Sequence, residues 1–499
     1  MQYRFYLCAL ATIALARPAF AQCPDGTPPP CRGATRATGP ATNSLAVLTF
    51  DNVSRDTNDA YLAEGLANDI SARLAQVERL TVTSRTMVRR LPNSASMTPQ
   101  AMGRALSATY LVSGGIQRGP GRMHVSVELL RSATGQTVWS SQFDRGASDL
   151  LAIQQEIASH VATDVTGRLL PGDRARLAAR PTISPEAYDH VLHGDFLMRS
   201  RSARDMERAL TEYETATRLD PRSARALAGY AMTLATCADW GRRCHGLTPD
   251  SLRSLASAAV REALAIDSLS AEAYRARSEI EYDRNLADGL RDAERAVVLD
   301  PGNPDLHHLR GWILAEMLRY DEAILAYRQA LALDPGLAAT HEHLARVAIV
   351  QRRMSSALAE LDTAIALEPG MDVAYARRAI LRAWLGDRPG AVADMDAASR
   401  SYGGPGAVAA RAGVEALLLA AAGDTANARA REDSLVAAGQ FSEPLGMAML
   451  RTGRGNEWLA SLPPNAALEP FWMQYPQYDA IRSDPRFVAA LERYRQGIR

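Results

Sequence analysis

Apolar residues recur at every fourth position in two stretches of the first third of the chain. These residues are Leu62, Leu66, Ile70 and Leu74 within residues 61–77, and Ile153, Ile157, Val161 and Val165 within residues 150–169. A four-residue spacing places such side chains on one face of a helix. The sequence therefore predicts two amphipathic helices, with a shorter one around Ala101–Leu106.

Between these helices the pattern becomes typical of strands. LAVLTF at 45–50 and RLTVTSR at 79–85 are short apolar runs, and residues 109–145 alternate apolar and polar positions between glycine-rich turns. The alternation predicts the strands Tyr110–Ile116, Met123–Arg131 and Thr137–Phe143. Helices and strands together predict an α/β domain over residues 44–170, a usual size for one domain.

The order of elements over residues 45–143 resembles the TolB amino-terminal-like, FlgO-like domain. The resemblance is carried by LAVLTFDNVSRD, YLAEGLANDISARL and ALSATYLVSGGIQRGPGRMHVSVELLRSATGQTVWSSQFDR. In that family the module commonly sits in signalling proteins between repeats and an effector, which is a nucleotide cyclase, a winged helix or a Ser/Thr kinase. A signal peptide and a short linker occupy the sequence ahead of it here, so we expect no effector domain before it.

From Ser184 onward the chain repeats itself. Pro301, Pro335 and Pro369 lie 34 residues apart, and each ends a Leu-acid-Pro phrase. Proline disfavours helix in the residue before it, so each phrase predicts the end of a helix. Small residues recur with the same period at Ala323/Ala330, Ala357/Ala364 and Ala391/Ala398, and at Gly311, Ala345 and Ala379. Such positions let two helices approach closely.

This period and pattern resemble the tetratricopeptide repeat, a helical hairpin of 34 residues. The resemblance predicts an all-α superhelical solenoid over residues 184–462, with five to seven units, of which some are degenerate and the one around Cys237–Pro249 is lengthened. Residues 463–499 are aromatic-rich and then helical. We interpret them as a carboxyl-terminal cap on the solenoid, and a partner-binding aromatic patch is the alternative.

The resemblance also implies a binding surface. In tetratricopeptide proteins the first helices of the repeats line a concave groove that receives peptides. Carried over by position, the partner-binding groove of this chain would present Arg275, Glu279, Asp305, His308, Trp312, Glu316, Glu342 and Arg346. Tryptophan and arginine are the residue types that most often anchor interfaces, which favours Trp312 and Arg346.

The amino terminus predicts export. Met1–Arg4 is basic, Phe5–Ala16 is an apolar run too short to span a bilayer, and Ala19-Phe20-Ala21 is a small-x-small cleavage site. We therefore expect a signal peptide over residues 1–21, cleaved after Ala21, and then a Pro/Gly-rich linker over 22–43. No later segment resembles a transmembrane helix. The predicted location is the periplasm or cell envelope.

The remaining cysteines agree with export. Cys23 with Cys31, and Cys237 with Cys244, form two close pairs, as expected of disulfides in an exported chain. An unbroken helix would hold the Cα atoms of Cys237 and Cys244 about 10 Å apart, so a bridged pair requires a loop. A zinc site with four cysteines is the alternative, but neither pair has CxxC spacing.

Charge and motifs narrow the function classes. Among 499 residues, Lys+Arg and Asp+Glu both number 56, which offers no global attraction to nucleic acid or to an anionic membrane. His307 and His341 occupy one repeat position that is Tyr274 and Tyr375 in other units, so inter-repeat packing is favoured over a metal site. GGIQRGPG at 114–121 lacks the Lys-Ser/Thr of a phosphate loop, and catalytic motifs are missing. We expect no enzyme activity, no metal and no cofactor.

The sequence therefore predicts an α/β domain followed by a helical solenoid, acting as a non-enzymatic adaptor or scaffold that binds a protein or peptide in the concave groove. A sensory component whose α/β domain binds a small ligand is the first alternative, and an enzyme or metalloprotein is the second. The partner and the oligomeric state do not follow from the sequence.

Overall fold

The α/β domain is built on a six-stranded sheet. The computed structural model describes residues 42–54, 56–91, 96–146, 149–178, 184–199, 203–239, 244–282, 285–401, 405–439, 442–461 and 474–497. The elements of the domain are β1 (Ser44–Val47), β2 (Asp51–Asn52), α1 (Ala60–Ala75), β3 (Thr81–Val82), α2 (Arg85–Arg89), α3 (Pro99–Ala105), β4 (Tyr110–Gly119), β5 (Arg122–Arg131), β6 (Gln136–Gly146), α4 (Leu150–Thr166) and α5 (Pro171–Ala178). The fold class predicted for this region is confirmed.

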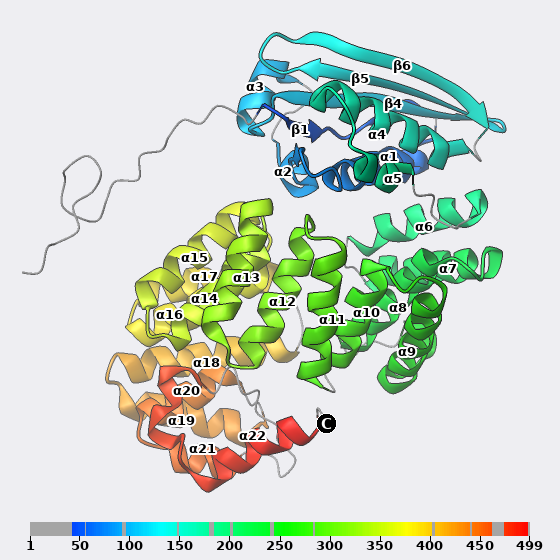
Figure 1. Cartoon of the computed structure of the whole chain (residues 1–499). Coiled ribbons are helices and arrows are strands. Elements are labelled where there is room, and N and C mark those ends of the chain that lie inside the picture. Colours follow the sequence, from blue (N-terminus) through cyan, green and yellow to red (C-terminus); the bar gives the residue numbers. More distant parts are fainter. Residues whose placement is uncertain are drawn as a thin grey trace, which may run out of the picture.

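The strand order is β3-β1-β4-β5-β6, with β2 paired to β4. β1 is parallel to β3 and β4, and β4-β5-β6 form an antiparallel meander. The apolar stripes of α1 and α4 bury against one face of the sheet, and α2 and α3 cover part of the other. Figure 1 shows α1, α4 and α5 lying between the sheet and the helices that follow.

The rest of the described chain is helical and folds as successive hairpins (Figure 1). The paired helices are α6 (Pro185–Met198) and α7 (Ala203–Leu219), α8 (Ala224–Asp239) and α9 (Pro249–Ile266), α10 (Ala271–Tyr282) and α11 (Leu286–Leu299), α12 (Pro304–Glu316) and α13 (Tyr320–Leu333), α14 (Ala338–Val350) and α15 (Met354–Leu367), α16 (Asp372–Leu385) and α17 (Arg388–Ser401), α18 (Pro405–Ala421) and α19 (Thr425–Ala437), and α20 (Glu443–Arg451) and α21 (Gly455–Ser461). We call the first helix of each pair helix A. A 3₁₀ segment η6 (Pro476–Ile481) and α22 (Pro485–Gly497) follow.

The Leu-acid-Pro phrases end helices as predicted. α11, α13 and α15 end at the leucine of each phrase, and the acid after it leaves the helical region, with ψ of 75°, 92° and 85° at Asp300, Asp334 and Glu368. The following proline imposes this extended conformation on the acid. A second periodic feature is the turn inside the hairpin, where Leu318, Arg352 and Gly386 stand 34 residues apart with φ of 62°, 61° and 87°.

The small residues lie where helices cross. Ala323, Ala330, Ala357, Ala364, Ala345 and Ala379 have no exposed surface. At Gly311 the ring of Tyr327 fills the space, and a Cβ there would lie 2.6 Å from Cδ1 of that ring. One and two repeats later the same pair of positions holds Ala345 with Leu361 and then Ala379 with Met395. A large ring is thus matched by glycine, and a smaller side chain by alanine.

Changing Gly311 to alanine is expected to destabilise the chain by about 1–3 kcal/mol, because overpacking at Tyr327 outweighs the better helix propensity of alanine. The double variant Gly311→Ala/Tyr327→Leu reproduces the pairing of the next repeat and should recover most of this loss. Urea unfolding of the two variants measures both effects. A double variant less stable than Gly311→Ala alone would refute the size-matching rule.

The α/β domain docks on the first two hairpins through α1. Arg225 of α8 donates to both carboxylate oxygens of Asp69 at 2.9 and 3.1 Å, and to Asp195 of α6 at 2.9 Å. The hydroxyl of Tyr188 donates to the same Asp69. Farther along the solenoid, Arg90 lies 3.9 Å from Glu368. The domain therefore follows the edge of the solenoid on which the Leu-acid-Pro turns lie.

The structure brings together one of the two predicted cysteine pairs, Cys237 and Cys244. Cys237 lies in the last turn of α8, Cys244 opens a short 3₁₀ helix (Cys244–Gly246), and their Cα atoms are 6.1 Å apart. This separation is within the range of a disulfide, and oxidation of the pair in the protein stays a prediction.

The other predicted pair is not shown by the structure. Cys23 and Cys31 both lie outside the described residues, so the disulfide between them is untested and stays a prediction. The signal peptide over 1–21 and almost all of the linker over 22–43 lie outside the described residues as well, and the same holds for those two predictions.

The described part of the carboxyl terminus packs against the end of the solenoid. Tyr478 of η6 has its ring centroid 5.6 Å from that of Trp458 in α21, and Phe487 of α22 lies 6.2 Å from Tyr478. All three side chains are buried. Within the described ranges, no helix combines the length and apolar character needed to cross a membrane.

Candidate functional site: the concave groove of the solenoid

The predicted groove residues occupy three consecutive A helices. Arg275 and Glu279 lie on α10, Asp305 through Glu316 on α12, and Glu342 with Arg346 on α14. Nε of Arg275 lies 3.3 Å from Oε1 of Glu279, and the same guanidinium approaches Asp305 at 3.8 Å. These three side chains are partly exposed and form a charged rim.

Beside the rim lies an aromatic patch, formed by Tyr282, His308, Trp312 and His343. Trp312 packs against Tyr282 with ring centroids 4.3 Å apart, and His308 stacks on His343 at 4.8 Å. All four side chains are partly exposed. Burial and the neighbouring His308, Arg346 and Arg377 hold the pKa of His343 well below its ordinary value, so this ring is neutral at physiological pH. His343 therefore contributes an uncharged ring to the patch.

The remaining predicted residues form a buried charged floor. Arg346 donates to Glu316 at 3.2 Å, and Arg377 of α16 donates to Glu342. All four side chains are under 9% exposed. Burial by itself would lower the pKa of Arg346, but Glu316 and Glu342 raise it above its ordinary value, so the cation is held firmly. The floor is a buried ion-pair network rather than an open surface.

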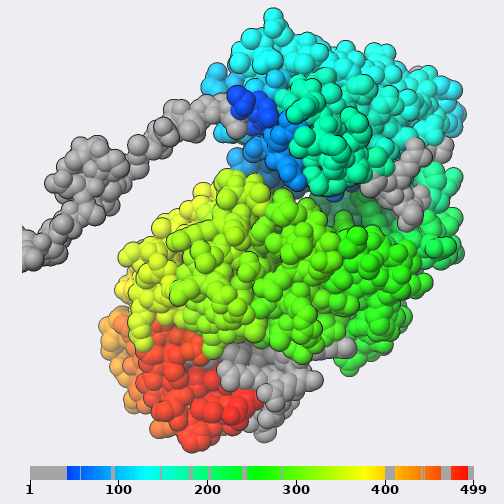
Figure 2. Space-filling view, viewed as in Figure 1, coloured from blue at the N-terminus to red at the C-terminus, as the bar shows by residue number. Residues whose placement is uncertain are grey.

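The carboxyl-terminal segment covers this floor. Nη1 of Arg377 donates to the hydroxyl of Tyr475 at 3.3 Å, and Arg352 pairs with Asp479 of η6. Figure 2 shows the carboxyl-terminal residues, in red, abutting the yellow-green surface of the middle repeats. The predicted groove residues therefore divide into a set beside an accessible aromatic patch and a set that the chain itself covers.

Sequence reasoning missed Arg377, His343 and Tyr475 as groove residues. Arg377 stands 34 residues after His343, so including this position of the repeat would have identified both. Tyr475 is 98 residues from Arg377, and no periodic signal joins them.

The histidines considered as metal ligands have other partners. Nε2 of His307 lies 2.9 Å from the carbonyl oxygen of Pro301, and Nδ1 of His341 lies 2.7 Å from Glu360 of α15. Across the described residues, no group of three or more His, Cys, Asp and Glu side chains could hold a metal ion. His307 thus contacts the turn that precedes its helix, and His341 contacts the second helix of its own hairpin.

Two family profiles match the chain. Residues 304–337 match the tetratricopeptide repeat, and residues 41–160 match a family described as "HilA/YgeH-like transcriptional regulator, second domain". The TolB amino-terminal-like description of the α/β domain stays a prediction.

One curated relative is 29% identical over 296 residues, "Putative adenylate cyclase 3" of Rhizobium meliloti (strain 1021). The match takes in 57% of this chain and 42% of the relative, so the chain spans less than half of that protein's length.

Several solved structures resemble the solenoid. PilW, described as a widely conserved type IV pilus biogenesis factor, is 19% identical with a TM-score of 0.36, and the match covers 45% of this chain and 98% of that one. YrrB, described as a TPR protein with an unusual peptide-binding site, is 17% identical with a TM-score of 0.28, covering 38% and 91%. A thermophilic TPR protein of Thermus thermophilus is 23% identical with a TM-score of 0.33, covering 39% and 98%.

The family assignment rests on the profile match and on the chain's own geometry. The matched residues 304–337 contain the whole α12–α13 hairpin. The same hairpin, with its Leu-acid-Pro ending and its small crossing residues, recurs at the 34-residue period. The chain is a tetratricopeptide-repeat protein with an amino-terminal α/β domain.

Proposed function

We propose that this protein is a non-enzymatic scaffold of the cell envelope that binds a polypeptide partner in the concave groove of its repeats. The observation that carries the proposal is the aromatic patch around Trp312, whose residues lie on three consecutive A helices and are partly exposed. Large rings that are rigid and partly accessible are frequent anchors of protein interfaces. The predicted signal peptide supports the envelope location.

The charged rim adds selectivity to this surface. Arg275 lies between Glu279 and Asp305, and the side chain of Asp305 is 54% exposed. Exposed charges of both signs favour a partner with complementary charges over a purely apolar one.

Trp312→Ala is expected to reduce capture of the partner at least about tenfold, because a central aromatic anchor contributes roughly 2 kcal/mol or more. The measurement is crosslinking and pull-down from the envelope of the source cells. Arg346 is unsuitable as a probe, since its replacement would break the buried pair with Glu316. Leu325→Ala is the matched control, because Leu325 is an exposed apolar residue of α13, 59% accessible and off the groove.

A partner held equally by the Trp312→Ala and Leu325→Ala variants would contradict binding in the groove. Attention would then move to the sensory alternative and to a cavity of about 180 Å³ between the α/β domain and α6, lined by Arg118, Tyr188 and Asp189 among others. The description of residues 41–160 as a transcriptional-regulator domain supports a signalling role of this kind.

A further inference from the structure

The segment 474–482 lies on the groove floor as a compact turn. Pro476 opens η6, and the guanidinium of Arg482 donates to the carbonyl oxygens of Gln474 and Tyr475 at 3.1 and 3.2 Å. Arg482 also donates to Asp479 at 2.7 Å. Arg482 thus fixes both ends of the turn, so the segment presents Tyr475 and Asp479 to the repeats as one preorganised unit.

The repeats meet this unit with cations at two points. Arg377 donates to the hydroxyl of Tyr475, and Arg346 lies close enough that Tyr475 contributes to its raised pKa. Arg352, at the turn after α14, pairs with Asp479. Both contacts come from residues on or directly after A helices. They bury the hydroxyl of Tyr475 and neutralise the carboxylate of Asp479.

The floor under the segment is unusual for a solenoid surface. Glu316, Glu342, Arg346 and Arg377 lie on A helices, yet each is under 9% exposed. Ion pairs on an open surface would face water, whereas Arg377 of this floor donates to Tyr475 of the segment. The groove therefore has the structure of a site with its ligand in place.

We propose that residues 474–482 are a built-in occupant of the groove, and that the partner contributes a peptide of the same chemistry, a tyrosine followed four residues later by an acidic residue, which displaces it. The partner half of the proposal rests on the proposed function. The aromatic patch continues from the covered set, since His343 precedes Arg346 on α14 and Trp312 precedes Glu316 on α12. A peptide that displaces the segment can extend onto Trp312 and gain contacts that the segment lacks.

Competition between the segment and a free peptide determines how much the affinity for the peptide should change. A tethered occupant acts at an effective concentration on the order of mM, so a free peptide of equal intrinsic affinity binds poorly until the occupant is weakened. Loss of the tyrosine and acid contacts in the chain should therefore strengthen binding of the free peptide at least about tenfold.

The test uses the full chain with the substitutions Tyr475→Ala/Asp479→Ala, which change neither Tyr478, packed against Trp458, nor Phe487, stacked on Tyr478. The probe is a fluorescein-labelled peptide of residues 474–483, QYPQYDAIRS, and the measurement is fluorescence anisotropy at peptide-to-protein ratios up to saturation. We expect the double variant to bind at least about tenfold more tightly than wild type. Tyr475→Phe, which keeps the ring and removes only the hydroxyl, should give a smaller increase.

Two controls locate the peptide. Arg486→Ala changes an exposed side chain of the same carboxyl-terminal region that contacts Asp484 and Asn456, and it should bind like wild type. Arg352→Glu in the double variant should weaken the peptide about fivefold, because Arg352 is 62% exposed and its replacement reverses the charge facing Asp479.

Equal binding of the peptide to wild type and the double variant, or binding to neither, would overturn the proposal and make the segment a permanent part of the fold. Failure of the proposed function reads differently, since it appears as partner capture that does not depend on Trp312. If the peptide binds as expected but partner capture does not depend on Trp312, the proposal that residues 474–482 occupy the groove is kept. Only the proposal that a partner displaces this segment is then refuted.

Discussion

Replacing Arg225 with methionine is expected to destabilise the folded chain by about 3 kcal/mol, because Asp69, whose side chain is only 14% exposed, then loses its cation. Arg225 joins Asp69 of the α/β domain to Asp195 of α6. The expected value is at the lower end for breaking a buried pair, since the arginine side chain keeps 28% of its surface exposed. Urea unfolding followed by circular dichroism measures the loss.

The unfolding curve should also change shape. Asp69 belongs to the α/β domain and Arg225 to the repeats, and we call the contact between these two parts the joint. The variant is expected to unfold in two steps, because the α/β domain and the repeats are no longer coupled. Arg208→Met is the matched control, because Arg208 pairs with Asp205 on the exposed surface of α7 and should change stability by less than about 1 kcal/mol. An Arg225→Met chain as stable as this control would refute the role of the joint.

The stability that Asp69 contributes at this contact should depend on pH. Burial would raise the pKa of Asp69, but Arg225 and Tyr188 together lower it below its ordinary value of 3.8. A carboxyl group with a lowered pKa stabilises the folded state above the unfolded pKa, and this contribution is lost as the pH falls through the folded pKa. The stability advantage of wild type over Asp69→Asn should therefore be complete at neutral pH and shrink below about pH 4.

Periodicity predicted the long elements of this fold and missed the short ones. The stripe of Leu62, Leu66 and Ile70 identified α1, and the alternation over 109–145 identified the β4-β5-β6 meander. β2 has two residues and α2 has five, too few to show a period. β2 exists because Asp51 and Asn52 pair with Gly115 and Ile116 of β4, a contact that no local pattern encodes.

The groove shows the same division. The 34-residue period placed Trp312 and Arg346 on A helices, because each repeat copies the geometry of the last. The period could not show that Arg377 would bind Tyr475, which lies beyond the repeats. The repeat pattern thus predicts on which face of a helix a residue lies. It does not predict whether that face is exposed to solvent, which here also depends on contacts with the non-repeating carboxyl-terminal segment.

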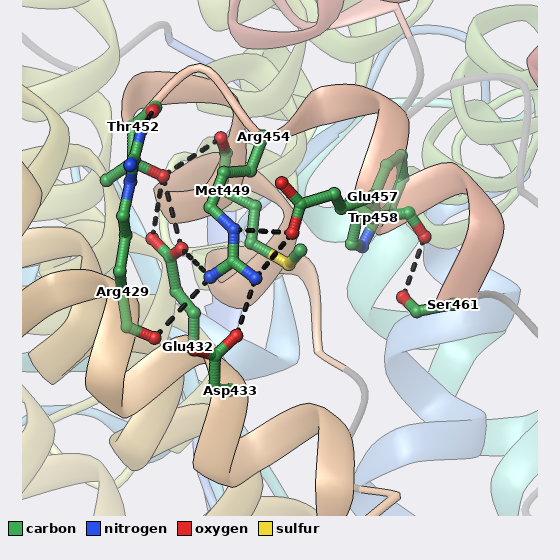
Figure 3. A network of polar contacts seen from close by, with 9 residues as sticks. All are labelled: Arg429, Glu432, Asp433, Met449, Thr452, Arg454, Glu457, Trp458 and Ser461. Atoms are coloured by element: carbon green, nitrogen blue, oxygen red, sulfur yellow. Dashed lines mark hydrogen bonds and ion pairs between the residues drawn. The ribbon is translucent and has the colours of Figure 1, made fainter.

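The end of the solenoid is held by another cation, Arg454, whose side chain is 13% exposed (Figure 3). This residue lies between α20 and α21 and donates to Glu432 at 3.0 Å and to Asp433 at 2.5 Å, both on α19, and to Glu457 of α21 at 2.6 Å. Glu432 has no exposed surface, and the hydroxyl of Thr452 donates to its two oxygens at 3.0 and 3.1 Å. One guanidinium therefore ties α19 to α21 around a carboxylate that water cannot reach.

Arg454→Met is expected to cost about 3–5 kcal/mol, because Glu432 is left as a buried charge without its cation. Arg454→Met/Glu432→Met removes both charges and should recover most of this loss, since a buried ion pair is replaced by apolar groups of similar volume. Trp458 of α21 is buried beside Tyr478, so tryptophan fluorescence in urea reports on this region. A double variant no more stable than the single one would contradict an electrostatic origin.

The pH dependence separates a lost charge from lost packing. Burial already raises the pKa of Glu432 above 4.5 in wild type, against the opposing effects of Thr452 and Arg454. Without Arg454 this carboxyl group can relieve the unpaired charge only by taking up a proton, so its folded pKa rises further. The stability deficit of Arg454→Met should therefore be largest at neutral pH and shrink as the pH falls toward 4.5, the ordinary pKa of the group. A deficit that stays constant with pH would instead assign the loss to the packing of the arginine side chain.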